Sequence, residues 1–191
     1  MEVPLTLYTA IEKRLAGMKH EKLLSDAQNI SFRYRNQSGK GERLLTSDSE
    51  ALAYSVARMP ATFGAVYSAL EQSLAHFDCS PKSLLDAGAG TGAASWAADA
   101  ILKLDSVVCL EREEAMRIAG MEIMKEGSEA LQGTKWLHRD LASEKITEQA
   151  DLVIASYVLN EMAEEGRIRT AKKLWNAAKM MLLIVEPGTP A

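Results

Sequence analysis

A run of glycines near the middle of the chain has the composition of a ligand-binding turn. Gly88, Gly90 and Gly92 alternate with other residues in "LLDAGAGTGAASWAA", between an apolar run and an alanine-rich run. Glycine lets backbone N–H groups approach a ligand closely and adopts positive φ without strain. The alanine-rich run predicts a helix, whose N-terminus directs partial positive charge toward a ligand above the glycines. We therefore expect a small-molecule site here, with a tight turn used only for packing as the alternative.

Asp86, two residues before the first glycine, helps to decide which of two classes of ligand this turn binds. The spacing Gly88-x-Gly90-x-x-Ala93 also satisfies the dinucleotide pattern, so a nicotinamide or flavin oxidoreductase is an alternative. Glu111, 23 residues beyond Gly88, would accept hydrogen bonds from ribose hydroxyls in either class. A carboxylate repels a pyrophosphate, whereas it favours the sulfonium and ammonium groups of S-adenosylmethionine. The sequence therefore favours S-adenosylmethionine as the cofactor.

The elements that position this turn change in character along the chain. Residues 1–76 carry apolar side chains at helical spacing and are expected to form an α-helical N-terminal region. Within it a helix should end at Met59, because proline disfavours helical geometry in the residue before it, and another should cover 61–76. Residues 77–191 alternate apolar strands with helices, which predicts an α/β domain with a doubly wound, mainly parallel, Rossmann-like sheet. The expected strands lie within 81–88, 106–113, 135–141, 150–158 and 179–188, and the expected helices are 93–104, 113–126, 161–179 and a short one over 143–149.

Composition describes an ordinary globular protein with an uneven charge. The 191 residues are 47% hydrophobic and 25% charged, with a formal net charge of −4, which argues against a purely electrostatic nucleic-acid binder. Residues 1–45 hold 8 Lys and Arg against 5 Asp and Glu, and residues 46–191 hold 14 against 21. No apolar run approaches the roughly 20 residues of a membrane span, and the N-terminus lacks a signal-peptide pattern. With only Cys79 and Cys109, we expect free thiols in a reducing, cytoplasmic compartment and no metal site.

Five stretches, in order along the chain, carry a resemblance to a known family. They are "RMPATFGAVYSAL", "LLDAGAGTGAASWAA", "LEREEAMRIAG", "DLVIASYVLNEM" and "LLIVEPGTPA". The glycine stretch looks like motif I of the class I, seven-stranded methyltransferases. Together the five resemble the small-ribosomal-subunit-associated methyltransferase-like family, known from mitochondrial ribosomes and present in bacteria, over roughly Leu45 to Ala191. The resemblance implies an S-adenosylmethionine-dependent methyltransferase acting on small-subunit rRNA or the assembling small ribosomal subunit. A non-catalytic assembly factor with the same fold and a small-molecule methyltransferase are the alternatives.

The resemblance also assigns cofactor contacts to seven residues at the ends of the first three strands. The glycine turn and the acid before it would form the wall against the methionine part of the cofactor. The acid that ends the second strand would hold the ribose, and a pair after the third strand would meet the adenine. For Asp140, the acid of that pair, a solvated loop or helix-capping role is the alternative. In that order the residues are Asp86, Gly88, Gly90, Gly92, Glu111, Asp140 and Leu141.

The segment after the fourth strand is where related enzymes place groups that face the transferred methyl. The catalytic candidates there are Ser156, Tyr157, Asn160 and Glu161. The sequence names no general base among them, and it lacks the Asn-Pro-Pro-Tyr and Asp-Pro-Pro-Tyr tetrapeptides. Methyl transfer is an in-line displacement that depends mainly on orientation and desolvation. Capping of the following helix is the alternative role for Asn160 and Glu161.

Two basic stretches are candidates for contact with RNA. The first, "FRYRNQSGKGER", interleaves aromatic and basic residues, so that rings can stack on bases while cations meet phosphates. Its candidate contacts are Arg33, Arg35, Lys40 and Arg43, with an ordinary solvated loop as the alternative. The second, "GRIRTAKKLW", is expected to be the solvated face of a helix.

The last apolar run, "MMLLIVEP", ends close to Ala191, whereas the family continues through further strands. We expect those final strands to be missing, which leaves the methyltransferase domain of residues 77–191 incomplete at its C-terminus. The run would then be an exposed edge strand, and such strands pair readily with another chain. We therefore expect a homodimer, or a partner, at this edge.

Overall fold

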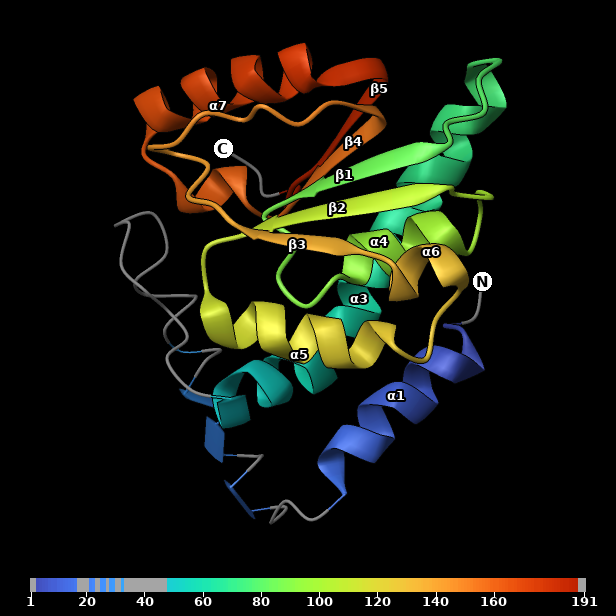
Figure 1. Ribbon diagram of the computed structural model, residues 1–191. Helices are drawn as coiled ribbons and strands as arrows, with labels where there is room; N and C mark the ends of the chain where they lie inside the picture. The colour runs from blue at the N-terminus through green and yellow to red at the C-terminus, as the bar shows by residue number, and fades with distance from the viewer. Residues whose placement is uncertain are drawn as a thin grey trace.

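A five-stranded sheet lies at the centre of the chain that the computed structural model describes, residues 3–16, 21–22, 25–26, 28–29, 32 and 48–188. The strand order is β3-β2-β1-β4-β5, and each neighbouring pair is parallel (Figure 1). The expected doubly wound parallel sheet is therefore confirmed. The strands are β1 (Ser83–Ala87), β2 (Ser106–Glu111), β3 (Lys135–His138), β4 (Ala150–Ser156) and β5 (Ala178–Val185).

β1 lies in the middle of the sheet, between β2 and β4. The chain moves outward from β1 to β2 and β3, then returns to the other side of β1 for β4 and β5. Open parallel sheets bind ligands at the carboxyl ends of the strands where the winding reverses in this way. The glycine turn follows β1 directly, and the N–H groups of Gly88 and Ala89 donate to the Leu110 carbonyl at 2.8 and 3.0 Å. The turn is thus anchored to β2 at the place where a ligand is expected.

Helices cover both faces of the sheet (Figure 1). Successive strand residues point to opposite faces, so Leu84 belongs to the core under one helical layer and Leu85 to the core under the other. The first layer is α1 (Leu5–Leu15), α3 (Asp48–His76), α4 (Ala93–Asp99), α5 (Glu114–Met124) and α6 (Glu129–Gln132), and the second is α7 (Glu164–Ala177).

The N-terminal helices share their core with the sheet. Leu7 and Ile11 of α1 and Phe63 of α3 belong to the same buried cluster as Leu84 and Val107 of the central strands. Burial of each such side chain contributes about 1.5–3 kcal/mol. The N-terminal helices therefore cover the same face of the sheet as α4, and their side chains share one core with it.

α3 continues through Pro60, so the expected end of a helix at Met59 is wrong. Proline in a helix interior removes one backbone hydrogen bond and clashes with the preceding turn, at a cost of about 3 kcal/mol. Met59 and Phe63, on either side of the proline, are buried in the core of the sheet. Their burial offsets this cost, and the helix remains continuous over 29 residues.

Other helix boundaries also differ from the expected ones. α4 ends at Asp99 rather than at residue 104, and no helix covers 143–149, a fully described segment. The expected helix over 161–179 is shorter, because the 3-10 turn η1 (Leu159–Glu161) precedes α7 and β5 begins at Ala178. α6 is short and was not expected. Among the described residues, none of the helices has the length and apolar character needed to cross a membrane.

Candidate functional site

All three glycines of the turn have a left-handed backbone, with φ of 72° at Gly88, 57° at Gly90 and 89° at Gly92. Residues with a Cβ rarely adopt these angles. A Cβ at Gly88 would collide with Val158, and one at Gly92 would collide with Met124. A Cβ at Gly90 would meet no atom within 4 Å. The outer two glycines therefore permit close packing, while Gly90 leaves open space beside its backbone that a ligand can occupy.

The Asp86 carboxylate is fully buried and holds the start of α4. Its Oδ2 accepts hydrogen bonds from the Ser95 N–H at 3.1 Å and from the Ser95 hydroxyl at 2.7 Å. Burial raises the pKa of Asp86 to about 6, against the opposing effect of these two hydrogen bonds. Within the described part of the chain, Asp86 Oδ1 has no hydrogen-bond partner. A buried acceptor therefore remains unsatisfied close to the glycine turn.

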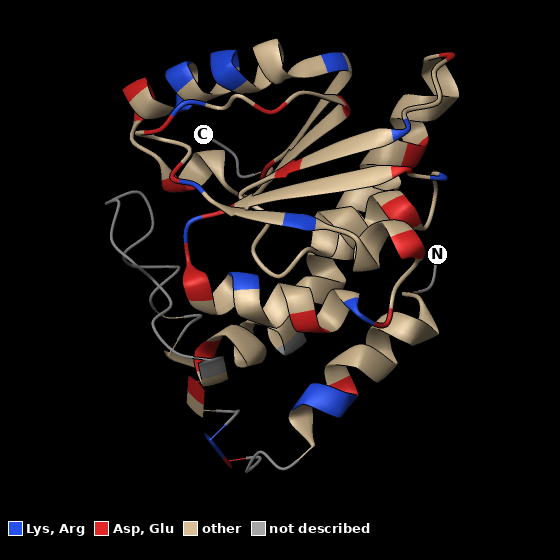
Figure 2. Cartoon of the chain, in the orientation of Figure 1, with Lys and Arg blue, Asp and Glu red and all other residues tan. Residues whose placement is uncertain are grey.

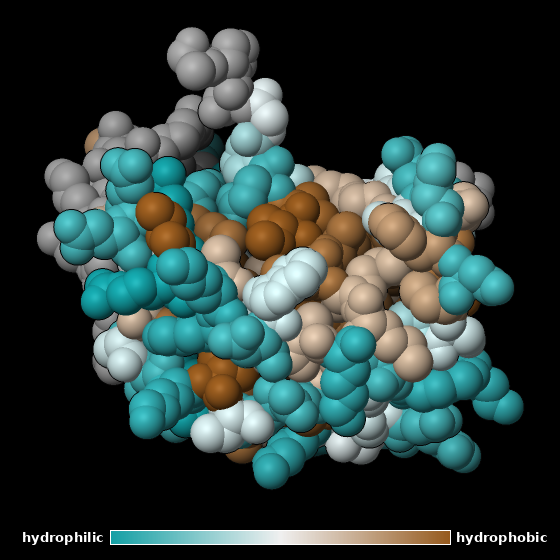
Figure 3. Space-filling model, turned by 90° about the horizontal axis from the view of Figure 1, so that it is seen from above, coloured by the Kyte–Doolittle hydropathy of each residue, from teal (hydrophilic) through white to brown (hydrophobic). Residues whose placement is uncertain are grey.

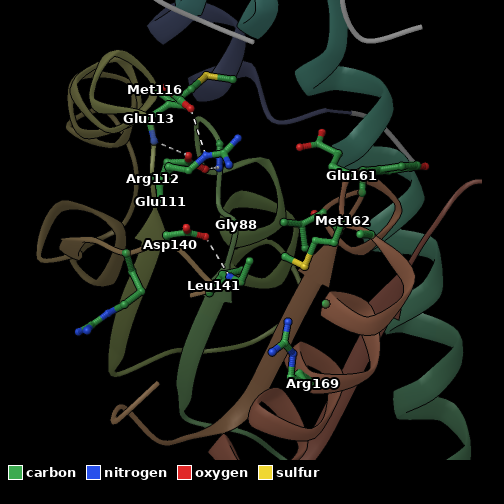
Figure 4. Close-up of a pocket in the computed structure, with 18 of the residues that line it drawn as sticks. Gly88, Glu111, Arg112, Glu113, Met116, Asp140, Leu141, Glu161, Met162 and Arg169 are labelled. Atoms are coloured by element: carbon green, nitrogen blue, oxygen red, sulfur yellow. Dashed lines mark hydrogen bonds and ion pairs between the residues drawn. The ribbon is translucent and has the colours of Figure 1, made fainter. Parts of the chain in front are cut away.

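A cavity of about 510 Å³ opens over the turn (Figure 4). Its volume is in the range of small-molecule sites. The close-up shows Glu111 and Asp140 facing it from one side, Glu161 and Met162 from the other, and Arg169 at one end (Figure 4). Of the predicted residues, Gly88, Gly90, Glu111, Asp140, Leu141, Ser156, Tyr157 and Glu161 line the cavity, and Asp86, Gly92 and Asn160 are not among the lining residues.

Glu111 ends β2 and turns back toward the glycines. Its Oε2 accepts a hydrogen bond from the Gly90 N–H at 2.8 Å, and its Oε1 accepts one from the Glu113 N–H at 2.7 Å. Burial raises the pKa of Glu111, although the two backbone hydrogen bonds favour its charged form. A carboxylate has about four lone-pair sites. Each oxygen therefore keeps the capacity to accept a further hydrogen bond from a ligand hydroxyl.

Asp140 and Leu141 follow β3 and line the cavity from its loop. Asp140 accepts hydrogen bonds from the Ala142 N–H at 3.0 Å and from the Ser143 hydroxyl at 2.8 Å. Partial burial on its own would raise the pKa of Asp140. The hydrogen bonds from Ser143 and Ala142 outweigh this effect, so the pKa lies below its ordinary value. The side chain thus caps its own loop, as the alternative interpretation held, and also contributes a charged carboxylate to the cavity.

Lys173 of α7 fixes this loop from the opposite side. Its Nζ donates to the carbonyls of Leu141 at 2.8 Å, Ala142 at 3.2 Å and Glu144 at 2.8 Å. The expectation of a solvated helix face is therefore wrong for Lys173. These contacts join residues 29–32 positions apart along the chain, so no local sequence signal predicts them.

Tyr157, directly after β4, has a strained backbone at the edge of the cavity. Its φ is 56°, and among the described residues it is the one non-glycine residue with positive φ. Such a conformation costs about 1–3 kcal/mol and persists only where its surroundings fix it. The Tyr157 N–H donates to the Val185 carbonyl at 2.8 Å, which ties the strained residue to β5. Strain of this kind is typical of functional sites.

Glu161 lies in η1 and faces other carboxylates across the cavity (Figure 4). Burial, followed by the negative charge of Glu111, raises the pKa of Glu161 to about 7, with Arg112 opposing. The N-cap of α7 is Ala163, and no side chain caps that end of the helix. The alternative role of Asn160 and Glu161 as caps is therefore wrong. Asn160 is exposed.

Glu186, directly after β5, supports this side of the cavity and was missed in the sequence. Its Oε1 accepts a hydrogen bond from the Leu159 N–H at 2.8 Å, which positions η1. Burial raises the pKa of Glu186. The available signal was an acid immediately after a strand at the carboxyl edge of a parallel sheet.

The basic residues predicted to contact RNA, Arg33, Arg35, Lys40 and Arg43, lie outside the described residues. Their role stays a prediction.

Comparison with known proteins shows which family this chain resembles. A family model for the mitochondrial small ribosomal subunit protein Rsm22 matches residues 48–191. The human mitochondrial ribosome assembly protein METTL17 is 30% identical over 158 residues, which make up 78% of this chain and 34% of that protein. The chain thus spans about a third of the length of this relative.

Solved methyltransferases share the fold. The magnesium protoporphyrin IX methyltransferase ChlM from Synechocystis, solved with bound S-adenosylmethionine, has a TM-score of 0.52 at 17% identity, over 83% of this chain and 74% of that chain. The plantazolicin methyltransferase BpumL, solved with S-adenosylhomocysteine, has a TM-score of 0.56 at 13% identity, over 91% of this chain and 61% of that chain. The expected class I methyltransferase fold is confirmed.

The expected cytoplasmic location is wrong. Both the matching family and the human relative are described as mitochondrial. Low cysteine content indicates a reducing environment, and it does not distinguish between reducing compartments.

Proposed function

The chain belongs to the mitochondrial small ribosomal subunit Rsm22 family, and from this membership we propose that it binds S-adenosylmethionine and acts on small-subunit rRNA or the assembling small ribosomal subunit. Membership confirms the resemblance carried by the five stretches of sequence. The observation that carries the proposal is the cavity over the glycine turn. Glu111, at the end of β2, lines this cavity, and the fold around it is that of a methyltransferase.

The groups around the cavity suit a cationic ligand that contains a ribose. The carboxylates of Glu111 and Asp140 attract a sulfonium or ammonium group, whereas the pyrophosphate of a dinucleotide would be repelled. Asp86 does not line the cavity, but its buried carboxylate behind the glycine turn adds negative charge that also attracts a cation. Gly90 leaves room for a ligand against its backbone. Glu111 would hold the ribose, with Asp140 and Leu141 at the adenine. When it is bound, the cofactor supplies an electrophilic methyl group.

Calorimetric titration of S-adenosylhomocysteine into the protein tests the cofactor. We expect Glu111→Ala to weaken binding at least tenfold, because a hydrogen bond to a charged group contributes about 1.5–3 kcal/mol. Glu122→Ala is the matched control, since Glu122 lies on α5, pairs with Lys125 and does not line the cavity. Circular dichroism establishes that both variants are folded. Unchanged affinity in Glu111→Ala, or no binding by the parent protein, would contradict the proposal.

On the acceptor side we propose Glu161 as the group that takes up the proton of the methyl acceptor, beside Ser156 and Tyr157. A general base works best with a pKa near the operating pH, and the pKa of Glu161 is about 7. Incorporation of labelled methyl groups into small-subunit RNA should rise between about pH 6 and about pH 8 in the parent protein. In Glu161→Gln this rise should disappear, while S-adenosylhomocysteine still binds. A pH profile in Glu161→Gln that matches the parent protein would exclude this role.

A non-catalytic role in assembly is the second candidate, because the human relative is named a ribosome assembly protein. In that case the protein would sediment with small ribosomal subunits and bind S-adenosylhomocysteine, and methyl groups would not enter the RNA. A small-molecule methyltransferase would not sediment with the subunits. The gradient and the methylation assay together separate the three functions.

A further inference from the structure

The outward face of α7 carries an exposed aromatic residue within a basic surface. Ile168, Lys172 and Trp175 recur at spacings of four and three residues, so they lie along one stripe of the helix. Trp175 is 72% exposed and Ile168 is 55% exposed. The buried residues of the same helix are Gly166, Thr170, Leu174 and Ala177.

One cation, Lys172, lies on this stripe, and two more flank it. Arg167 and Arg169 are exposed beside it, and Arg167 donates to the Met162 carbonyl at 2.9 Å, which holds its guanidinium at the surface. Lys172 forms no ion pair with any described residue. Glu164 and Glu165 precede Ile168 by four and three residues, so they lie at the N-terminal end of the same face, in the first turn of α7 (Figure 2), where they interact favourably with the helix dipole. From Ile168 onward the stripe is therefore locally positive, on a part of the chain whose overall charge is negative.

The surface of the molecule on the α7 side of the sheet contains both apolar and hydrophilic areas. Figure 3 shows hydrophobic areas bordered by hydrophilic side chains on this side of the molecule. An indole ring that is exposed next to cations suits a ligand with flat apolar rings and negative groups. Unpaired nucleotides have both, since every base has a face that stacks and every linkage carries a phosphate.

We propose that this face of α7 docks a single-stranded segment of RNA, with a base stacked on Trp175 and phosphates beside Lys172 and the flanking arginines. The inference rests on the proposed action on the small ribosomal subunit, and it names the surface through which that RNA is held. Arg169 lines the cavity as well as bordering the stripe. RNA held on α7 would therefore reach the edge of the cavity.

Fluorescence anisotropy with a short, labelled, single-stranded RNA of mixed sequence measures this binding at several salt concentrations. Trp175→Ala should weaken binding roughly fivefold or more, because stacking of one base is lost. Lys172→Gln should lower the slope of log affinity against log salt by about one. The matched controls are Phe77→Ala, an aromatic residue 63% exposed after α3, and Lys103→Gln, an exposed lysine after α4. Both controls follow helices on the opposite face of the sheet and should leave the affinity and the slope unchanged.

Intrinsic fluorescence gives a second, independent readout. Trp96 is buried, Trp136 is half-buried and Trp175 is 72% exposed, so Trp175 is the most exposed of the three tryptophans. Addition of the RNA should quench the emission of the parent protein, and Trp175→Ala should remove that quenching.

Failure of this inference is distinguishable from failure of the proposed function. Neither Trp175 nor Lys172 lines the cavity, so both variants should bind S-adenosylhomocysteine as the parent protein does. RNA affinity that Trp175→Ala and Lys172→Gln leave unchanged overturns the inference, whatever the cofactor result. A change in molar mass of the free protein on Trp175→Ala, with RNA affinity preserved, would make this face a protein interface and also overturn it.

Discussion

At the scale of single residues, Asp86 links the stability of the fold to pH. Burial raises the pKa of Asp86 to about 6 in the folded protein, whereas an aspartate in an unfolded chain has a pKa of about 3.9. Between these values the folded state holds a proton that the unfolded state has lost. The contribution of Asp86 to stability is therefore present below about pH 4 and is lost as the pH rises to about 6.

Asp86→Asn should remove the fall in stability between about pH 4 and about pH 6. Asparagine keeps an oxygen that accepts the hydrogen bonds from Ser95, and it carries no charge. At neutral pH the variant should be more stable than the parent protein by up to about 3 kcal/mol. Thermal unfolding from about pH 4 to about pH 7 measures the difference between the two proteins. Asp105→Asn, at an exposed aspartate, is the control and should follow the parent protein. Parallel curves for Asp86→Asn and the parent protein would show that Asp86 is ionised throughout this range.

Tyr157 allows the cost of its left-handed backbone to be measured apart from its ring. Tyr157→Gly and Tyr157→Ala both delete the ring, but glycine accepts a φ of 56° and alanine does not. We expect the glycine variant to be the more stable of the two by about 1 kcal/mol in urea unfolding. At Ser156, the last residue of β4, the order should reverse, with alanine more stable than glycine. An alanine variant more stable than the glycine variant at both positions would mean that Tyr157 is not strained.

At the scale of elements, α3 holds a proline that local rules place at a helix end. Pro60→Ala should raise the free energy of unfolding by about 1–2 kcal/mol, because the helix regains up to about 3 kcal/mol and the unfolded chain regains about 1 kcal/mol of entropy. Chemical denaturation measures this change, with Glu71→Ala on the same helix expected to lie within about 0.5 kcal/mol of the parent protein. A destabilised Pro60→Ala variant would show that the packing of Met59 and Phe63 depends on the shape that proline imposes.

The elements that the sequence predicted are those whose signals are local. Apolar runs of strand length predicted the five strands, and positive φ explains why the turn after β1 consists of glycines. Pro60 is the opposite case, because burial on either side of it outweighs a local rule. Lys173 and Glu186 bind backbone groups some 27–32 positions away along the chain, so only the tertiary fold brings each to its partner. Glu111 and Asp140 were predictable because they end or follow strands, whereas cavity residues from helices, such as Tyr54 and Met116, and the strain at Tyr157 have no sequence signal.

At the scale of the whole molecule, the strand order leaves β5 at one edge of the described sheet. β5 pairs with β4 on one side, and its Met180 and Ile184 are 60% and 42% exposed. An edge with exposed apolar side chains and backbone groups free to pair is a template for another strand. The expected homodimer through this edge stays a prediction, and the positions of these two side chains make it specific.

Light scattering across the micromolar range tests that prediction. We expect the molar mass to rise with protein concentration toward that of a dimer, because pairing of two β5 edges satisfies backbone groups and covers Met180 and Ile184 together. Lysine on an edge strand opposes such pairing, so Met180→Lys combined with Ile184→Lys should leave a monomer at every concentration. Phe77→Lys introduces a lysine at an exposed apolar residue after α3, away from β5, and should not change the association. A parent protein that is monomeric throughout would remove the dimer, and association that survives both lysines would move the interface away from β5.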